Sequence, residues 1–326
     1  NSPRSLQTFE QCIIDLQALY QVKAEHIVCD AHPGYTPTRW AHQQDLPVDE
    51  IYHHHAHASA TYIDALQNNQ DLDNILVFTW DGVGLGPDST LWGGDALLGK
   101  PGQWQRIASF RPFKLPGGER AGREPWRSAA AICWEAGLER VKQGETGKKV
   151  RPGSGREAGL GHPSREWPGP AGTNREAGLG QCPLDEASDP LLYSFWQQGT
   201  NAPQTSAAGR LFDAASALCG VCSSASFEGQ GPMQLEALAA TYIHASTIIP
   251  TELPLSNNKG IYIADWAPLI PMLTNTSHTP AERAAHFHLS MARTLLQQAK
   301  QVREDTGVIS IGLAGGVFQN RILTEK

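Results

Sequence analysis

The sequence lacks the features that mark several classes of protein. Its 326 residues include 26 lysines and arginines against 33 aspartates and glutamates, a formal net charge of −7, so there is no basic excess of the kind that nucleic-acid-binding surfaces carry. No apolar run approaches the roughly 20 residues of a membrane-spanning helix. No basic segment followed by an apolar one opens the chain, as it would in a signal peptide. We therefore expect neither nucleic-acid nor membrane partners, and a cytoplasmic location.

Cysteine arrangements suited to metal binding or disulfides are also scarce. Six cysteines are scattered through the chain, which is typical of reduced thiols in the cytoplasm. Cys219 and Cys222 form a single CxxC pair, and without a second pair it predicts buried packing rather than zinc binding. No Ser-His-Asp or Cys-His set is apparent, so the sequence does not indicate a side-chain nucleophile.

What is present is the composition and patterning of a globular α/β chain. Apolar residues make up 40% of it, enough for a sizeable core, and the length fits about two domains. Strand and helix patterns alternate, which predicts an α/β architecture. The expected strands cover residues 26–29, 49–52, 75–80, 90–98, 105–110 and 308–313. The expected helices cover residues 9–20, 126–139, 209–221, 235–244 and 280–304, the last with Thr279 as its N-cap.

One long segment has a different character. Residues 144–190 are crowded with Gly, Pro, Arg and Glu, and Arg-Glu-Ala-Gly-Leu-Gly occurs twice, at 156–161 and 175–180. Such a segment buries too little apolar surface to offset the entropy of ordering it. We expect a disordered low-complexity insertion at 144–190, between an N-terminal lobe of residues 1–143 and a C-terminal lobe of residues 191–326.

Four histidines lie within five residues, at 53–57. His53 and His57 are four residues apart, so on a helix they share one face and can chelate a single metal ion. His54 and His57, three apart, could do so less well. The alternative is an exposed, polar start of a helix, but so many imidazoles together are hard to explain by packing. The cluster predicts a metal site.

An acidic, glycine-rich stretch follows the apolar run at 75–80. Asp81 comes directly after this expected strand, so its carboxylate is predicted to lie at the carboxyl edge of the sheet, where ligands of open α/β sheets gather. Beside the histidine pair, Asp81 becomes a candidate third metal ligand. Gly82, Gly84 and Gly86 would let backbone N–H groups approach phosphate oxygens. Without the histidines, the same stretch would be only a hairpin turn.

Two other segments are candidates for binding an anion. Gly315 and Gly316 stand between an expected strand and a helix beginning near Phe318, where free N–H groups would face an anion. Tight packing explains the two glycines equally well. Residues 206–213 open a helix, and Asp213 in its first turn would suit the helix dipole or serve capping alone.

These segments occur in an order that resembles one known family. The motifs are Cys-Asp-Ala-His-Pro at 29–33, His-His-x-Ala-His at 53–57, Asp-Gly-Val-Gly-Leu-Gly at 81–86, Leu-Trp-Gly-Gly-Asp at 91–95, Leu-Pro-Gly-Gly at 115–118, Ala-Gly-Arg-Leu-Phe-Asp at 208–213, Phe-Glu-Gly-Gln at 227–230 and Gly-Gly-Val-Phe-Gln-Asn at 315–320. Together they resemble the C-terminal, TsaD-like domain of the HypF family of hydrogenase maturation carbamoyltransferases. The resemblance covers nearly the whole chain outside 144–190.

The resemblance implies a fold and a set of site residues. The fold is the duplicated actin-like ATPase, or ribonuclease H-like, fold, with a nucleotide cleft between two lobes. His53, His57 and Asp81 would bind a divalent metal, iron or zinc. The residues expected around the nucleotide, ATP or carbamoyl-adenylate, are Gly93, Gly94, Ser206, Gly209, Asp213, Gly220, Gly316 and Asn320.

The resemblance also implies an activity. In the family, a carbamoyl group passes from carbamoyl-adenylate to the C-terminal cysteine thiol of the partner HypE, towards the cyanide ligands of [NiFe]-hydrogenase. The alternatives are an O-carbamoyltransferase acting on a small-molecule hydroxyl and a non-catalytic docking fragment. The sequence begins without Met, and the family's fourth metal ligand, an aspartate, would follow Lys326. We therefore expect a fragment that is truncated at the C-terminus and carries an incomplete metal site.

Overall fold

The computed structural model describes residues 3–68, 72–138, 184, 189–243 and 248–325. Most of the segment expected to be a disordered insertion, 144–190, lies outside the described residues. In the described part of the chain, no helix combines the length and the apolar character needed to cross a membrane. The division into lobes at 1–143 and 191–326 stays a prediction.

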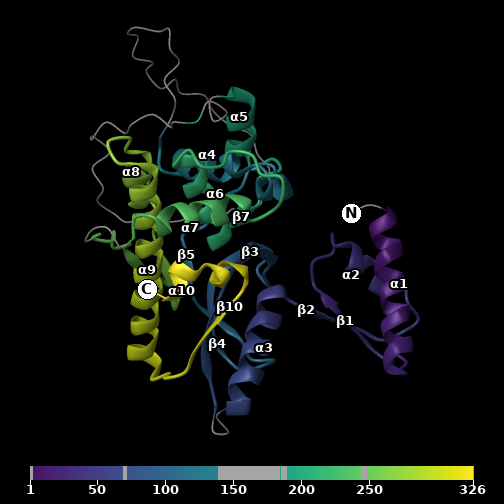
Figure 1. Ribbon diagram of the computed structural model, residues 1–326. Helices are drawn as coiled ribbons and strands as arrows, with labels where there is room; N and C mark the ends of the chain where they lie inside the picture. Colours follow the sequence, from purple (N-terminus) through teal and green to yellow (C-terminus); the bar gives the residue numbers. More distant parts are fainter. Residues whose placement is uncertain (1–2, 69–71, 139–183, 185–188, 244–247, 326) are drawn as a thin grey trace, which may run out of the picture.

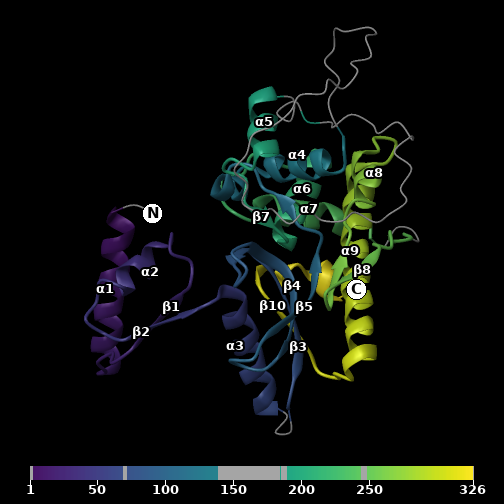
Figure 2. The same ribbon diagram turned by 180° about the vertical axis from the view of Figure 1, so that it is seen from behind.

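Residues 3–51 form a small N-terminal unit. It consists of α1 (Pro3–Tyr20), β1 (Ile27–Asp30), α2 (Thr36–Ala41) and β2 (Val48–Ile51). The two strands pair in parallel, with Ile27 opposite Val48, and the Phe9 ring of α1 packs edge-on against Trp40. Both views of the ribbon show this unit standing apart from the rest of the molecule, joined to it where β2 leads into α3 (Figures 1 and 2).

The remaining elements form the main body. They are α3 (His53–Asn68), β3 (Ile75–Leu85), β4 (Leu91–Gly99), β5 (Gln105–Phe110), β6 (Phe113–Lys114), the 3-10 turn η1 (Gly118–Gly122), α4 (Pro125–Glu135), α5 (Pro190–Gln198), β7 (Gln204–Thr205), α6 (Ala208–Leu218), α7 (Gln230–Ala240), β8 (Leu255–Asn258), β9 (Ile261–Ala264), α8 (Leu269–Thr274), α9 (Pro280–Thr306), β10 (Ile311–Ala314), the 3-10 turn η3 (Gly316–Gln319) and α10 (Arg321–Glu325).

One mixed sheet joins strands from both sides of the 144–190 segment. Its main path runs β10-β3-β4-β5-β9-β8, and β6 and β7 attach beside β4. β3 and β4 are antiparallel neighbours, whereas β10 runs parallel to β3 and β9 parallel to β5. The C-terminal strand β10 therefore lies directly beside β3, which carries Asp81, and this pairing brings distant segments of the chain together.

The two faces of β3 pack into different cores, as alternation along a strand requires. Ile75 and Val77 face a small cluster with Ala58 and Tyr62 of α3. Leu76, Phe78 and Trp80 face the main core. Helices α4, α6, α7 and α9 contribute to that main core, and α3 covers the opposite face (Figure 1). α3 is therefore held against β3, with its first turn near Asp81.

Most expected elements are confirmed, with some shifted ends. The N-cap of α9 is Thr279, and a capping box with Glu282 is present. α7 begins at Gln230 rather than 235, because Pro232 lies in the first turn, where its missing N–H costs nothing. β10 begins at Ile311, and at the helix expected near Phe318 the 3-10 turn η3 comes first and α10 begins only at Arg321. Cys219 and Cys222 are buried free thiols.

One expectation about the main site was wrong. The strand expected at 75–80 does not end before Asp81, because β3 continues through the glycine-rich stretch to Leu85. A register shift between Trp80 and Gly84 interrupts the pairing, which then resumes opposite Leu91 and Trp92 of β4. Asp81 therefore lies at this irregularity inside the strand, and the irregularity turns its side chain out of the ladder.

Candidate metal centre and adjoining cavity

Three of the predicted metal ligands meet at one point. His53 and His57 extend from the first turns of α3, and Asp81 extends from β3. The Asp81 Oδ2 atom lies 3.2 Å from His53 Nε2 and 3.1 Å from His57 Nε2, and the two Nε2 atoms are 3.2 Å apart. Within the described residues, these three side chains form the one group with metal-ligand geometry.

A glycine allows α3 to approach β3 closely enough for this meeting. A Cβ atom at Gly84 would lie 2.7 Å from both His53 Cβ and His54 Cε1, closer than real side chains pack. Because His54 is fully buried there, it faces the sheet rather than the metal group. Burial also lowers the pKa of His54 to about 4, so the ring stays neutral at ordinary pH.

Asp30 reaches the cluster from the N-terminal unit. Its Oδ2 atom lies 3.1 Å from His53 Nδ1, on the side of the ring away from Asp81. The hydrogen bond to Asp81 raises the pKa of His53, burial opposes the rise, and the bond to Asp30 adds to it. Asp30 belonged to one of the motifs, but no role was predicted for it, since its partner His53 is 23 residues away.

The carboxylate of Asp81 is fixed at both oxygens. Its Oδ1 atom accepts hydrogen bonds from the backbone N–H groups of Gly82, at 2.8 Å, and Gly316, at 3.3 Å, while Oδ2 faces the two imidazoles. Burial would raise the pKa of Asp81, but the hydrogen bonds from His53, His57 and Gly82 hold it well below its ordinary value. Asp81 is therefore ionised at physiological pH.

The arrangement fits a divalent metal. Three potential ligand atoms, two imidazole nitrogens and a carboxylate oxygen, converge within about 3.2 Å. Ligand atoms bound tetrahedrally to zinc at about 2.0–2.1 Å would lie roughly 3.3–3.4 Å from one another. Histidine and carboxylate also form the donor set that iron accepts. The cluster needs little change to hold such an ion.

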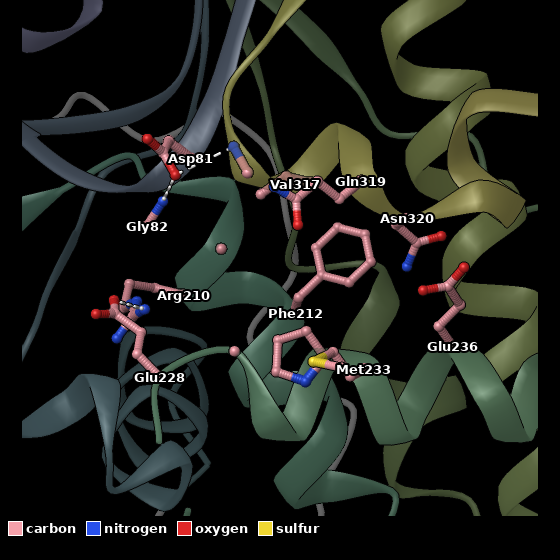
Figure 3. Close-up of a pocket in the computed structure, with 14 residues that line it drawn as sticks. Asp81, Gly82, Arg210, Phe212, Glu228, Met233, Glu236, Val317, Gln319 and Asn320 are labelled. Atoms are coloured by element: carbon pink, nitrogen blue, oxygen red, sulfur yellow. Dashed lines mark hydrogen bonds and ion pairs between the residues drawn. The ribbon is translucent and has the colours of Figure 1, made fainter.

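A cavity of about 390 Å³ opens on the other side of Asp81. Figure 3 shows Asp81 and Gly82 at one end, Arg210 and Glu228 along one side, and Asn320 and Glu236 at the far end. The lining residues come from β3, α6, α7 and the η3 segment. The cavity is therefore assembled from four separate stretches of chain.

Glycines bring these stretches together around Asp81. A Cβ atom at Gly209, at the start of α6, would lie 2.8 Å from the carbonyl oxygen of Asp81. One at Gly315 would lie 2.2 Å from the carbonyl oxygen of Trp80, and its φ of +100° also requires glycine. Because α6 and η3 both rest on the β3 backbone, the cavity begins directly at Asp81, the candidate metal ligand.

The eight residues expected around the nucleotide do not all lie at this cavity. Gly209, Gly316 and Asn320 line it. The N–H groups of Gly93 and Gly94, in β4, instead donate to the buried Asp95 carboxylate, and the Ser206 hydroxyl donates to it too.

The other two expected residues lie along α6. Gly220 follows the C-terminus of the helix, with a φ of +75° and no neighbour of its Cβ position within 4 Å. Asp213 is buried in the second turn rather than in the first. Burial raises the pKa of Asp213 to about 7, although the nearby Arg210 guanidinium lowers it.

Several charged residues of the cavity had no assigned role in the sequence. Arg210 is almost fully buried and ion-pairs with Asp213 at 3.2 Å and with Glu228 at 2.9 Å. Glu236 lines the far end. Arg210 and Glu228 did belong to recognised motifs, and that was the signal that could have drawn attention to them. Their convergence depends on the packing of α6 against α7.

Comparison with known proteins identifies the family. Residues 77–326 match the family model described as "Carbamoyltransferase, Kae1-like Domain, second subdomain", and residues 1–64 match the one described as "HypF Kae1-like domain". The chain belongs to the HypF family. It is 32% identical over 321 residues to carbamoyltransferase HypF of Synechocystis sp., covering 98% of this chain and 38% of that protein.

A second relative and a solved structure from the same family are similar to nearly the whole chain. The chain is 31% identical over 320 residues to carbamoyltransferase HypF of Rhodobacter capsulatus, covering 96% of this chain and 36% of that protein. It thus spans less than two fifths of the length of these two relatives. A full-length HypF solved in a phosphate- and nucleotide-bound form superposes with a TM-score of 0.75 at 25% identity, covering 99% of this chain and 44% of that one.

A second solved structure supports the fold alone. HypF of T. kodakarensis matches with a TM-score of 0.73 at 21% identity, covering 100% of this chain and 39% of that one. The α/β fold expected from the family resemblance, that of the HypF Kae1-like domain, is confirmed.

Proposed function

We propose that this chain transfers a carbamoyl group from carbamoyl-adenylate to the C-terminal cysteine thiol of a HypE-type acceptor protein. His53, His57 and Asp81 hold a divalent metal, iron or zinc, and the adjoining cavity takes the adenylate. The carbamoylated thiol then serves cyanide ligand synthesis in [NiFe]-hydrogenase maturation. Membership of the carbamoyltransferase HypF family supports the reaction class.

The observation that carries the proposal is the shared use of Asp81. One carboxylate oxygen faces the two imidazoles, and the other accepts N–H groups at the wall of the cavity. A ligand that fills the cavity therefore ends beside the metal ligands. The volume, about 390 Å³, falls within the range of roughly 300–1,000 Å³ that is usual for small-molecule sites.

The transfer requires no nucleophile from this chain. The acceptor sulfur forms a bond to the carbamoyl carbon, the bond from that carbon to the phosphate oxygen breaks, and AMP leaves with that electron pair. The thiol proton passes to solvent or to the leaving phosphate. A bound divalent cation supplies a Lewis acid where negative charge grows. This chemistry agrees with the lack of a catalytic triad in the sequence.

We assign the phosphate of the adenylate to Arg210. It is the one cation among the described residues that line the cavity, beside the acids Asp81, Glu228 and Glu236. Charge-assisted hydrogen bonds from a guanidinium are strong and match phosphate geometry. The three carboxylates repel a phosphate group from the rest of the cavity. We therefore place the phosphate beside the Arg210 guanidinium.

The decisive experiment measures metal content, carbamoyl-adenylate binding and carbamoyl transfer. Purified chain is supplied with carbamoyl-adenylate and a peptide ending in cysteine, and the carbamoylated peptide is followed by mass spectrometry. We expect metal binding and transfer in the wild type and loss of both in His57→Ala. The control is His55→Ala, on the same helix but outside the ligand group, which should keep both.

Other outcomes separate the alternatives. Transfer to a small-molecule hydroxyl, with none to the thiol peptide, would establish an O-carbamoyltransferase instead. Metal and adenylate binding without transfer to either acceptor would favour a docking fragment. Equal transfer by the wild type and His57→Ala would refute the role of the histidine cluster.

A further inference from the structure

The N-terminal unit touches the candidate metal centre through one carboxylate. Asp30 ends β1, and its Oδ2 atom lies 3.1 Å from Nδ1 of His53. The opposite ring nitrogen of His53 faces Asp81 and His57. The imidazole is thus held between two carboxylates, one from the main body and one from a unit that otherwise stands apart from it (Figure 2).

This contact determines which nitrogen of His53 can bind a metal. An ionised carboxylate only accepts hydrogen bonds, so Nδ1 must carry the proton that it donates to Asp30. Nε2 faces the Asp81 carboxylate and donates to it in the same way. A metal ion would displace that proton, and Nδ1–H would stay on Asp30, so Nε2 would be the ligating atom. A carboxylate behind a ligating histidine in this way fixes the tautomer and orientation of the ring.

Asp30 is itself held in position. Its Oδ1 atom accepts the backbone N–H of His32 at 2.8 Å, and its carbonyl oxygen accepts the Thr38 hydroxyl at 2.8 Å. The Tyr35 ring from the same loop stacks on His32, with ring centroids 4.3 Å apart. Contacts within the N-terminal unit therefore hold the Asp30 carboxylate in place beside His53.

We propose that Asp30 is the positioning residue for His53, and that the N-terminal unit thereby forms part of the metal centre. The inference rests on the proposed metal site and adds a component to it. Two other histidine–carboxylate pairs of the unit, His26–Asp49 and His42–Glu50, have short contacts as well, but their side chains are about half exposed or more. The Asp30 and His53 side chains are more buried, and His53 also contacts Asp81, another candidate ligand.

The test compares Asp30→Ala, Asp30→Asn and the control Asp49→Ala by metal affinity. Zinc or cobalt binding to the full chain is measured by competition with a chelator, after thermal unfolding has established that each variant folds. Outer-shell partners of metal-ligating histidines typically contribute about 10–100-fold in affinity. We expect a loss in that range for Asp30→Ala and a change within about twofold for Asp49→Ala.

The asparagine variant distinguishes orientation from a general structural role. Its single amide oxygen can accept from His53 or from the His32 N–H, but not from both. We expect partial rescue, with an affinity between those of the wild type and Asp30→Ala. In the zinc-loaded protein, the slowly exchanging Nδ1–H proton of His53 should give a downfield NMR resonance. It should persist in Asp49→Ala and disappear in Asp30→Ala.

The outcomes separate this inference from the proposed function. If the wild type binds metal and transfers carbamoyl while Asp30→Ala binds metal as tightly, the positioning role fails and the function stands. If Asp30→Ala weakens metal binding but no variant transfers carbamoyl, the positioning role stands and the function fails. If the wild type binds no metal, both fail together.

Discussion

The candidate metal cluster and the cavity share Asp81, yet they are built in different ways. The cluster consists of side-chain donors from α3 and β3 that meet within 4.8 Å. The cavity is bounded by the starts of α6 and η3 and by charged residues from α6 and α7. The cluster is a compact set of candidate ligand atoms. The cavity is a space between backbone segments that glycines allow to approach one another.

The difference indicates how each half can fail. The cluster depends on a few atoms, so a single side-chain change should remove its function and leave the fold intact. The cavity depends on glycines that let α6 and η3 rest on β3, so changes there should affect stability and binding together. The variants below test whether the two halves can be separated in this way.

The largest effect is expected for Asp81→Asn. The substitution removes the charge of the shared ligand, while an amide oxygen can keep the hydrogen bonds from Gly82 and Gly316. We expect metal affinity to fall by at least about 100-fold, more than outer-shell changes cause, with a much smaller loss of AMP binding. Metal competition and calorimetry with AMP measure the two. Asp88→Asn is the control. If Asp81→Asn lowered metal affinity and AMP affinity equally, the cluster and the cavity would not be separable.

The next prediction concerns pH and the cavity side. His288 of α9 is buried, and its Nε2 accepts from the Asn320 amide at 2.9 Å. Burial lowers its pKa from 6.5 to about 4. Because the folded pKa lies below the unfolded one, the stability is fully present above about pH 6.5 and is lost as the pH falls toward 4, by up to about 3 kcal/mol.

His288→Gln should therefore flatten the acid side of the stability profile. Urea unfolding of the metal-free chain at several pH values between 4 and 7.5 would measure this. His286→Gln, two residues away and only half-buried, is the matched control and should change the slope less. An unchanged slope in His288→Gln would show that protonation of this ring does not limit stability.

A smaller effect is expected where the backbones meet. Gly209→Ala would put a methyl group 2.8 Å from the Asp81 carbonyl oxygen and 3.0 Å from Gly82 Cα, so we expect about 1–3 kcal/mol of destabilisation together with weaker AMP binding. Gly220→Ala meets no neighbour within 4 Å but keeps a φ of +75°, which costs roughly 1 kcal/mol. It should lower stability without changing AMP affinity. Reduced AMP binding by Gly220→Ala alone would contradict this view of the cavity.

The same contrast explains how far the sequence could predict the site. The spacing of His53 and His57 is a property of one helix, so their shared face followed from the sequence. Asp81 was proposed as the third ligand from its place after a buried strand, and the family resemblance implied the same residue. The continuation of β3 through Leu85 did not follow, because three glycines are typical of a turn. The strand persists only because β4 resumes pairing at Trp92 and Leu91, a tertiary effect.

Residues joined by long-range packing were harder to predict. Asp30 meets His53 because β1 and β2 pair in parallel ahead of α3. Arg210 meets Glu228 through the packing of α6 and α7. Local sequence patterns do not predict such long-range contacts, so these residues were noted only as members of motifs. Asp213 was expected in the first turn of its helix and lies buried in the second, because α6 begins at Ala208.

The smallest predicted effect is the most specific test of the cavity. Glu228 is 64% exposed and accepts from Arg210 at 2.9 Å, and exposed ion pairs contribute only about 0–1 kcal/mol. Glu228→Gln should therefore hardly change stability. It should nevertheless strengthen AMP binding a few-fold, because the phosphate no longer competes with a carboxylate for the guanidinium.

Arg210→Gln should have the opposite effect on AMP binding. It should weaken AMP binding in the wild-type and Glu228→Gln backgrounds alike, whereas zinc affinity should stay within about twofold in every case, since Arg210 does not belong to the ligand group. Titration of each variant with AMP by calorimetry gives the comparison. If Glu228→Gln weakened AMP binding, the carboxylate would be contacting the nucleotide rather than competing with it. The anion would then have to be held elsewhere in the cavity.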